Sequence, residues 1–258
     1  MAKPRSRLGE LLREYPFGFL VGSLFLIIIG APMTSELDRE VPFLRGEVAI
    51  APLVILLTLA AAHAIWPVAR NKATSIILGG IVLTFLSLST VFHHHFITAA
   101  HLIGQILFLG YVIAVTTRVV FSAPVVDGNI LFGAASIYLL IGVLAGFAYA
   151  LIQLLLPNSF TIIPPGGPGP GPLMHPDTGW LIYFSFTTLT TVGFGDVLPA
   201  SQITRSLAVL EAVVGQILLV VMMARLVGLH VAQVSSRKQH APVVFETADH
   251  PPGRGQND

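Results

Sequence analysis

Six long apolar runs constrain the fold of this chain more than any other feature. Their approximate ranges are 16–33, 48–68, 73–92, 96–121, 128–156 and 204–234. Each run is long enough to cross a hydrocarbon core of about 30 Å, which takes about 20 helical residues. Transmembrane strands are a poor alternative, because the runs do not alternate apolar and polar residues. The runs predict an all-α membrane protein with six transmembrane helices.

The composition agrees with this prediction and excludes several classes of protein. Hydrophobic residues make up 54% of the chain and charged residues only 10%, whereas a soluble domain carries about 25% charge. We therefore expect the lipid bilayer as a partner. The absence of cysteine excludes disulfides, thiolate metal sites and a cysteine nucleophile. The sequence has neither a nucleophile–base pair nor a basic nucleic-acid surface, so we expect no enzyme, no cofactor, no nucleic acid and no identifiable soluble ligand.

Lysine and arginine predict the orientation of the helices. Basic residues lie in the segment 1–15, in the turn Arg70-Asn71-Lys72, at Arg118 and at Arg237-Lys238, all on one side of the predicted membrane. This side is expected to be cytoplasmic. With six helices, both termini of a multi-pass protein of the cell membrane face the cytoplasm. The run 16–33 is also open to reading as a signal peptide, but we favour a retained helix because no clear cleavage sequence follows it.

The connection between the last two runs differs from the others. Its first part, 157–176, is rich in proline and glycine and predicts a stiff extracellular loop with neither helix nor strand. An apolar segment, 180–190, is too short to span the membrane and predicts a re-entrant half-helix, with Asp177 or Thr178 as its N-cap. Backbone that is irregular at membrane depth needs protein or water around it.

The half-helix leads into the sequence Thr190-Thr191-Val192-Gly193-Phe194-Gly195-Asp196. Alternating glycines let successive carbonyl groups point the same way, which produces a column of oxygen atoms. The sequence resembles the potassium-channel signature T-V-G-Y/F-G-D. The resemblance covers about residues 130–234, the helix–pore loop–helix module of that family. A glycine-rich turn between apolar helices is the alternative interpretation.

The resemblance implies a role for each residue of this stretch. In the family, filter carbonyl groups coordinate K⁺, the permeant ion; here the ion-binding positions are Thr191, Val192, Gly193 and Phe194, completed by Gly195, with Asp196 at the outer mouth. The chain holds a single copy of the signature, so a ring of four requires a homotetramer. The residues that would support the filter from the pore helix are Tyr183, Phe184, Thr187, Thr188 and Thr190.

Two departures from the family pattern bear on this support. Phe194 stands where tyrosine is commonest, so the hydroxyl that usually bonds to the aromatic cuff, expected at Tyr183 and Phe184, is missing. Thr187 stands where some channels have a glutamate. Glu211, a lone acid in the last run, is open to two interpretations: a structural acid, or a partner of Thr187 or Thr188 that steadies the filter.

Two further residues of the last run are candidates for a role in the pore. Gly215 lies at the spacing of a hinge glycine in related pores, and hinge bending and close packing against the pore helix both explain it. Arg225 is expected to extend toward the inner interface; a role at an inner gate is the alternative.

The first four helices resemble a voltage sensor in number only. The fourth run carries Arg118 as its single basic residue, whereas a sensor needs several. We therefore predict a peripheral scaffold and weak voltage dependence. The cluster His93-His94-His95, near the outer end of the third run, is a candidate for metal or proton sensing, although adjacent helical positions point about 100° apart.

Together these features predict a potassium-selective channel. Its parts are a cytoplasmic segment (1–15), a peripheral four-helix region (16–122), a pore domain (123–234) and a disordered cytoplasmic tail (235–258). The alternatives are a non-selective cation channel of the same architecture and a secondary transporter. A transporter predicts inverted repeats and charged or broken helices at the midplane, which the sequence lacks apart from Glu211.

Overall fold

The computed structural model describes residues 15–40, 46–69, 72–92, 94–163, 171–172 and 178–239. Helices predominate. They are α2 (Pro16–Glu40), α3 (Gly46–Ile65), α4 (Lys72–Val91), α5 (His95–Ser122), α6 (Gly128–Leu155), α7 (Thr178–Leu189) and α8 (Gln202–Gln239). Three short strands accompany them: β1 (Phe160–Ile162), β2 (Gly171–Pro172) and β3 (Val197–Pro199). The prediction of a mostly helical fold is confirmed.

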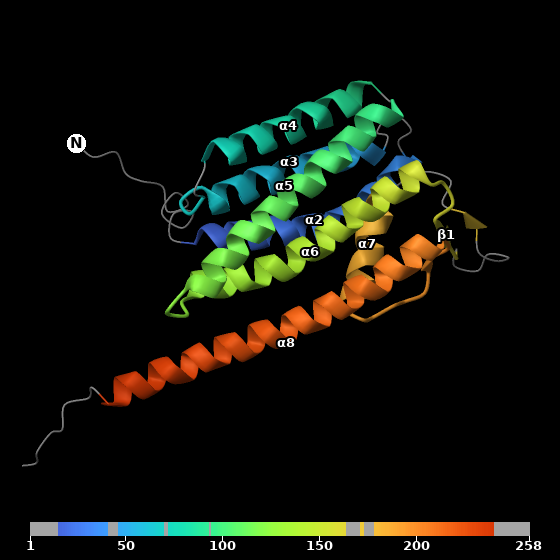
Figure 1. The fold of residues 1–258 in the computed structure, drawn as a ribbon. Helices are drawn as coiled ribbons and strands as arrows, with labels where there is room; N and C mark the ends of the chain where they lie inside the picture. Colours follow the sequence, from blue (N-terminus) through green and yellow to red (C-terminus); the bar gives the residue numbers. More distant parts are fainter. Residues whose placement is uncertain are drawn as a thin grey trace, which may run out of the picture.

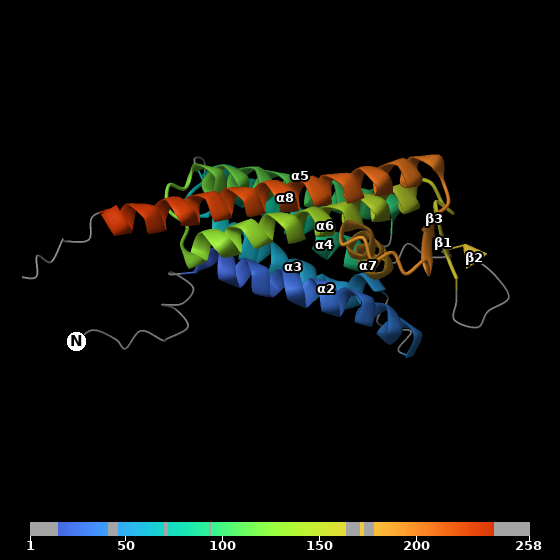
Figure 2. The same ribbon diagram turned by 90° about the horizontal axis from the view of Figure 1, so that it is seen from below.

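The helices lie in a bundle whose long axes run roughly side by side (Figure 1). α2 packs against α3, α6 and α7, while α5 packs between α4 and α6. The short helix α7 is enclosed by α2, α6 and α8. Of the two apolar clusters among the described residues, the larger runs through the bundle, and its largest fully buried side chains include Phe17, Phe108, Phe147 and Tyr149. The bundle therefore holds α7 at one end, beside the strands (Figure 2).

Five of the described helices, α2, α4, α5, α6 and α8, are long and apolar enough to cross a membrane. α3 has a shorter apolar part, Ala49–Ile65. α2 is longer than predicted. It includes Pro32, near the end of the apolar run, and continues past the run to Glu40. An apolar run gives the part of a helix that lies in lipid, but a helix can extend beyond it where its polar residues reach water.

A three-stranded antiparallel sheet in the order β2-β1-β3 contradicts the prediction that 157–176 contains no strand. β1 pairs with β3, which follows the glycine-rich stretch, so that Thr161 lies opposite Leu198. Phe160 is fully buried and packs against Tyr149 and Phe184. The prediction from local composition was wrong here because the strands form by pairing between segments that are separated in the sequence.

α8 is the longest helix and the least covered. It has 38 residues and extends past the other helices (Figure 1). Only one narrow stripe of it is buried, at Thr204, Ala208, Glu211, Gly215 and Met222. Apolar residues on its other faces, such as Val209, Ile217 and Val220, are exposed. A single chain therefore leaves most of this helix for lipid or for another protein surface.

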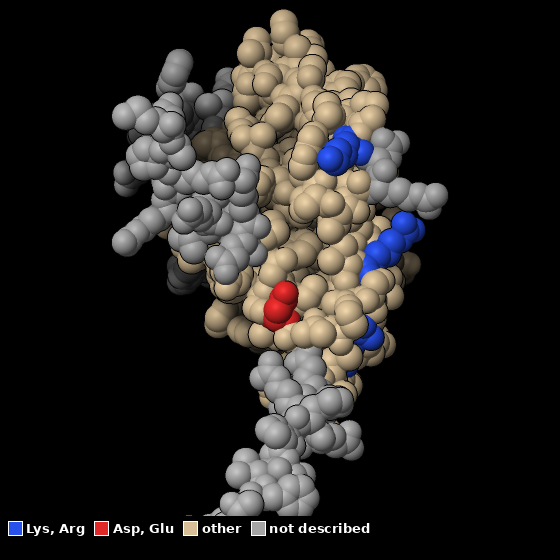
Figure 3. Space-filling model, turned by 90° about the vertical axis from the view of Figure 1, so that its left-hand side faces the viewer, with Lys and Arg blue, Asp and Glu red and all other residues tan. Residues whose placement is uncertain are grey.

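Basic side chains gather at the end of the bundle opposite the sheet (Figure 3). Lys72 begins α4 there, Arg118 lies in the last turns of α5, and Arg225 contacts the end of α5. Arg205, by contrast, hydrogen-bonds Pro199 at the sheet end. Among the described side chains, Lys72, Arg118 and Arg225 therefore lie at one end of the bundle and Arg205 at the other.

Candidate ion-conduction site

The position of α7 is fixed by a close contact with α6. Gly142 and Gly146 lie four residues apart on α6, the small-xxx-small spacing that lets membrane helices approach closely. A Cβ atom at Gly146 would lie 2.8 Å from Ile182 Cα, and one at Gly142 would lie 2.7 Å from the ring of Phe186. Glycine is therefore required at 146, where the contact is with backbone, and the lack of a side chain at both positions lets α7 lie directly on α6.

The segment that follows α7, Thr191–Gly195, is called the filter segment below. Its backbone alternates: φ is positive at Thr191 (61°), Gly193 (53°) and Gly195 (78°). Alternate left-handed residues turn successive peptide groups, which allows carbonyl oxygens to point toward a common side. Space does not require the two glycines, since a Cβ at either would meet nothing within 4 Å in this chain. Their φ angles do.

Hydrogen bonds attach the start of the filter segment to the end of α7. The backbone N–H of Thr191 donates to the Thr188 carbonyl and that of Gly193 donates to the Thr187 carbonyl, both at 3.0 Å. The side-chain hydroxyl groups of Thr187 and Thr190 donate to the carbonyl groups of Phe184 and Phe186 in α7. The predicted support residues Thr187 and Thr188 therefore contact the filter segment through their backbone.

One whole side of the filter segment is uncovered in the single chain. Every residue from Thr190 to Gly195 is exposed, including Val192 at 53% and Phe194 at 69%. Exposed apolar side chains and unpaired carbonyl groups at membrane depth require surrounding protein or water. A single chain therefore leaves the surface of the filter segment without the cover that it needs.

Asp196 follows the filter segment and lies in a small polar network. Its Oδ2 accepts a hydrogen bond from the Tyr183 hydroxyl at 2.7 Å, and its Oδ1 accepts one from the Val197 N–H at 3.0 Å. Its carbonyl accepts from Ile163, just after β1. The ring of Tyr183 stacks on Phe194, with 6.3 Å between the ring centres, and Trp180 packs edge-on against it. Tyr183 therefore braces both Phe194 and Asp196.

Phe184 lies away from the filter segment, although sequence reasoning paired it with Tyr183 in a cuff. Its ring contacts Tyr149 of α6 and Phe160 of β1 edge-on, at 5.3 and 5.2 Å. Adjacent residues of a helix point about 100° apart, so two neighbours cannot both face the same strand. Phe184 instead anchors α7 to the core beneath the sheet.

Glu211 is buried, and its partners differ from the predicted ones. Ser185 and Tyr149 lie within hydrogen-bonding distance of its carboxyl oxygens, at 2.5 and 2.6 Å. The predicted partners were Thr187 and Thr188. α8 meets the face of α7 that carries Ser185, and the Thr187 hydroxyl is already bonded within α7. Glu211 thus contacts the pore helix through a different residue.

Gly215 packs directly against the end of α7. A Cβ atom there would lie 2.5 Å from Leu189 Cδ1 and 3.2 Å from the Leu189 carbonyl oxygen. The same carbonyl accepts a hydrogen bond from the Tyr138 hydroxyl at 3.1 Å. Of the two explanations offered by the sequence, close packing accounts for this glycine in the structure.

Arg225 ties α8 to the turn between α5 and α6. Its guanidinium group donates hydrogen bonds to the carbonyl groups of Phe121, at 2.5 Å, and Ala123, at 3.4 Å. The guanidinium carbon also lies 5.1 Å from the centre of the Phe121 ring, a cation–π contact. These carbonyl groups end α5, where a positive charge complements the helix dipole. Arg225 thus joins two helices at the basic end of the bundle.

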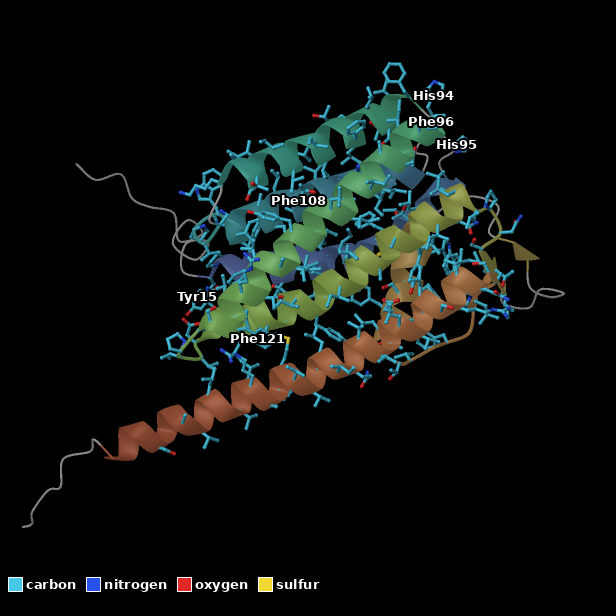
Figure 4. All side chains as sticks on the ribbon, viewed as in Figure 1. Tyr15, His94, His95, Phe96, Phe108 and Phe121 are labelled. Atoms are coloured by element: carbon cyan, nitrogen blue, oxygen red, sulfur yellow. The ribbon has the colours of Figure 1, made fainter. Side chains whose placement is uncertain are left out.

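His94 and His95, two members of the histidine cluster, lie at the sheet end of the bundle (Figure 4). His93 is outside the described residues. His94 precedes α5 with extended backbone, and His95 begins the helix; both are exposed. Within the described part of the chain, no three His, Cys, Asp or Glu side chains form a group that would hold a metal ion. The structure therefore adds no support for metal binding there.

Several residues of this site escaped the sequence analysis. Ser185, Tyr149 and Tyr138 contact Glu211 or α7, yet each is an ordinary polar residue within an apolar run. The spacing of Gly142 and Gly146 is a readable signal, since small residues four apart indicate close helix packing in a membrane. The hydroxyl groups give no such signal, because their partners lie on other helices.

Comparison with known proteins agrees with this geometry. A family described as ion channel matches residues 172–230, which include α7, the filter segment and most of α8. No curated protein and no solved structure matches the chain. The family match covers the part of the chain in which the filter segment, Asp196 and Glu211 lie. This part of the chain is therefore similar to an ion-channel domain, and the described helices around it include several that are long and apolar enough to cross a membrane.

Proposed function

We propose that this protein is a potassium-selective channel that conducts K⁺ passively. The single observation that carries the proposal is the alternating backbone of the filter segment, with positive φ at Thr191, Gly193 and Gly195. Such alternation suits a column of carbonyl oxygens that replaces the hydration shell of K⁺. In this proposal the ion is bound by the carbonyl groups of residues 191–194, and the Asp196 carboxylate attracts cations to the mouth.

The proposal requires a homotetramer. One chain supplies one filter segment, and four are needed to surround an ion. The exposure of Val192, Phe194 and the apolar faces of α8 supports this, because these surfaces need cover. In the assembly, four filter segments line the axis above four copies of α8. The matched domain supplies the pore, and residues 16–122 form a peripheral scaffold around it.

The proposed orientation follows the basic residues. α2, α3, α4, α5, α6 and α8 are taken as six spans in the cell membrane, with the basic end of the bundle in the cytoplasm. The filter segment then faces outward, residues 1–15 and 235–258 are cytoplasmic, and ions enter the filter from outside. α5 carries Arg118 as its only arginine or lysine, which supports weak voltage dependence.

Reconstitution of the purified protein in liposomes tests the proposal. We expect the reversal potential under opposed K⁺ and Na⁺ gradients to lie near the K⁺ equilibrium potential, with block by barium. A reversal potential near zero would instead indicate the non-selective cation channel. Uptake driven by a coupled ion gradient, without single-channel currents, would indicate a secondary transporter.

A matched pair of glycine variants controls for a contaminating conductance. Gly193→Ala forces a side chain onto a residue with φ of 53° and is expected to abolish K⁺ current. Gly228→Ala adds the same methyl group to α8, where a Cβ meets nothing within 4 Å, and is expected to leave the current intact. Equal currents in the two variants would contradict conduction through the filter segment.

A further inference from the structure

Short oxygen–oxygen contacts join α6, α7 and α8 inside the channel domain. Tyr149 Oη lies 2.6 Å from Glu211 Oε2. Ser185 Oγ lies 2.5 Å from Glu211 Oε1 and 2.6 Å from the carbonyl oxygen of Gly142. Ser185 is completely buried, and Tyr149 and Glu211 are at least nine-tenths buried. Within the described residues, Glu211 has no lysine or arginine partner.

Each of these contacts needs a proton of its own, because two oxygen atoms this close repel each other unless a hydrogen lies between them. Tyr149 supplies the proton for its own contact. Ser185 has one hydroxyl hydrogen but two close oxygen neighbours, and the Gly142 carbonyl has no hydrogen to offer. If Ser185 donates to Glu211, its contact with the Gly142 carbonyl has no hydrogen at all; if Ser185 donates to Gly142, the contact with Glu211 is satisfied when the carboxyl group itself carries a proton.

We propose that Glu211 is held as a neutral carboxylic acid that donates its proton to Ser185 and thereby positions the pore helix. The resulting chain runs in one direction. Tyr149 donates to Oε2 of Glu211, Oε1 donates to Ser185, and Ser185 donates to the Gly142 carbonyl. It begins and ends on α6 at residues two helical turns apart, so α7 and α8 are tied to one face of that helix.

The proton on Glu211 lowers the cost of burying this side chain among membrane helices. An unpaired carboxylate inside a membrane protein is costly, whereas a neutral acid with every hydrogen bond made is not. The chain sets the rotation of α7, whose last residue, Leu189, precedes the filter segment by two positions. That this positioning serves K⁺ conduction rests on the proposed function; the presence of the proton does not.

Asp196 provides a contrast within the same chain. Its two carboxyl oxygens accept from Tyr183 and from the Val197 N–H, and each donor supplies its own hydrogen. The contacts of Asp196 therefore need no proton from the carboxyl group.

Solid-state NMR of the wild-type, isotope-labelled full chain in lipid measures this directly. The carboxyl carbon shift distinguishes an acid from a carboxylate, and we expect the acid form for Glu211 at neutral pH. A carboxylate shift at Glu211 would overturn the proposal. This measurement needs no current, so a protein that conducts no K⁺ but shows the acid form would defeat the proposed function alone.

Variants test the positioning role. Glu211→Gln keeps the chain, because its amide NH₂ donates to Ser185 and its amide oxygen accepts from Tyr149; we expect K⁺ current and thermal stability close to wild type. Glu211→Ala and Ser185→Ala break the chain and should shift the equilibrium toward non-conducting or unfolded protein by about tenfold. A Gln variant as impaired as the Ala variant would overturn the positioning role.

Discussion

The Tyr183 hydroxyl donates a hydrogen bond to Asp196 Oδ2 across 2.7 Å, and the same ring stacks on Phe194. One side chain of α7 therefore holds both the last aromatic residue of the filter segment and the acid that follows it. Phe194 lacks the hydroxyl group that a tyrosine would offer here, but Tyr183 holds this end of the filter segment instead. The bond runs from the pore helix to the acid, and the stacking covers the phenylalanine ring.

Tyr183→Phe should destabilise the conducting state. The change removes one hydrogen bond to a carboxylate but keeps the ring that stacks on Phe194, so we expect a shift of about fivefold toward non-conducting channels. Single-channel recording of open probability measures it. Tyr111→Phe removes the same atom from α5, away from the filter segment, and should leave open probability unchanged; equal effects of the two changes would contradict the bracing role.

Gly215→Ala should lower the thermal stability of the purified protein by about 1–3 kcal/mol. The new methyl group meets Leu189 at 2.5 Å, and the Leu189 carbonyl at 3.2 Å is backbone that cannot rotate away. Gly228→Ala is the matched control, because it lies on the same helix in open space and should gain up to about 1 kcal/mol of helix stability. A hinge without close packing predicts no loss of stability in Gly215→Ala.

Gly146→Ala should separate α6 from α7. A Cβ there lies 2.8 Å from Ile182 Cα and 3.2 Å from its nitrogen, so only movement of a whole helix relieves the clash. We expect a loss of about 1–3 kcal/mol in thermal unfolding and a loss of K⁺ current. Gly110→Ala on α5 meets Leu144 only at 4.0 Å and serves as control. Tolerance of both changes would show that α6 and α7 are not held in this contact.

Arg225→Gln should loosen α8 from the end of α5. The variant loses the cation–π contact with Phe121 and the charge on its hydrogen bonds to two carbonyl groups, which together are worth about 1.5–3 kcal/mol. We expect a changed open probability, measured in planar bilayers. Arg118→Gln removes one positive charge from the same end of the bundle. If both variants gate alike, net charge rather than this contact is responsible.

Conductance should vary only weakly with voltage in symmetrical K⁺. Each elementary charge that crosses the whole field contributes about 2.3 kcal/mol per 100 mV, and α5 offers only Arg118, close to its end. Macroscopic current recorded over a wide voltage range measures this. A steep sigmoid conductance curve, lost in Arg118→Gln, would establish a sensor that the sequence does not suggest.

The sequence alone determined the features that depend on local order. The length and apolarity of its runs predicted the long helices of α2, α4, α5, α6 and α8, because the hydrocarbon core sets a minimum length for a span. The alternating glycines at 193 and 195 indicated a backbone that other residues avoid; in the structure both have positive φ, which glycine adopts at little cost. The short run before them predicted α7 to within two residues.

Only the tertiary structure decided how these parts meet. The partners of Glu211 are Ser185 and Tyr149, 26 and 62 positions away, and no local pattern distinguishes them from Thr187. β1 forms because Phe160 is buried and its backbone pairs with β3, so a proline-rich loop is partly strand. Periodicity and composition describe neighbours along the chain, whereas hydrogen-bond partners and close contacts depend on which helix faces meet.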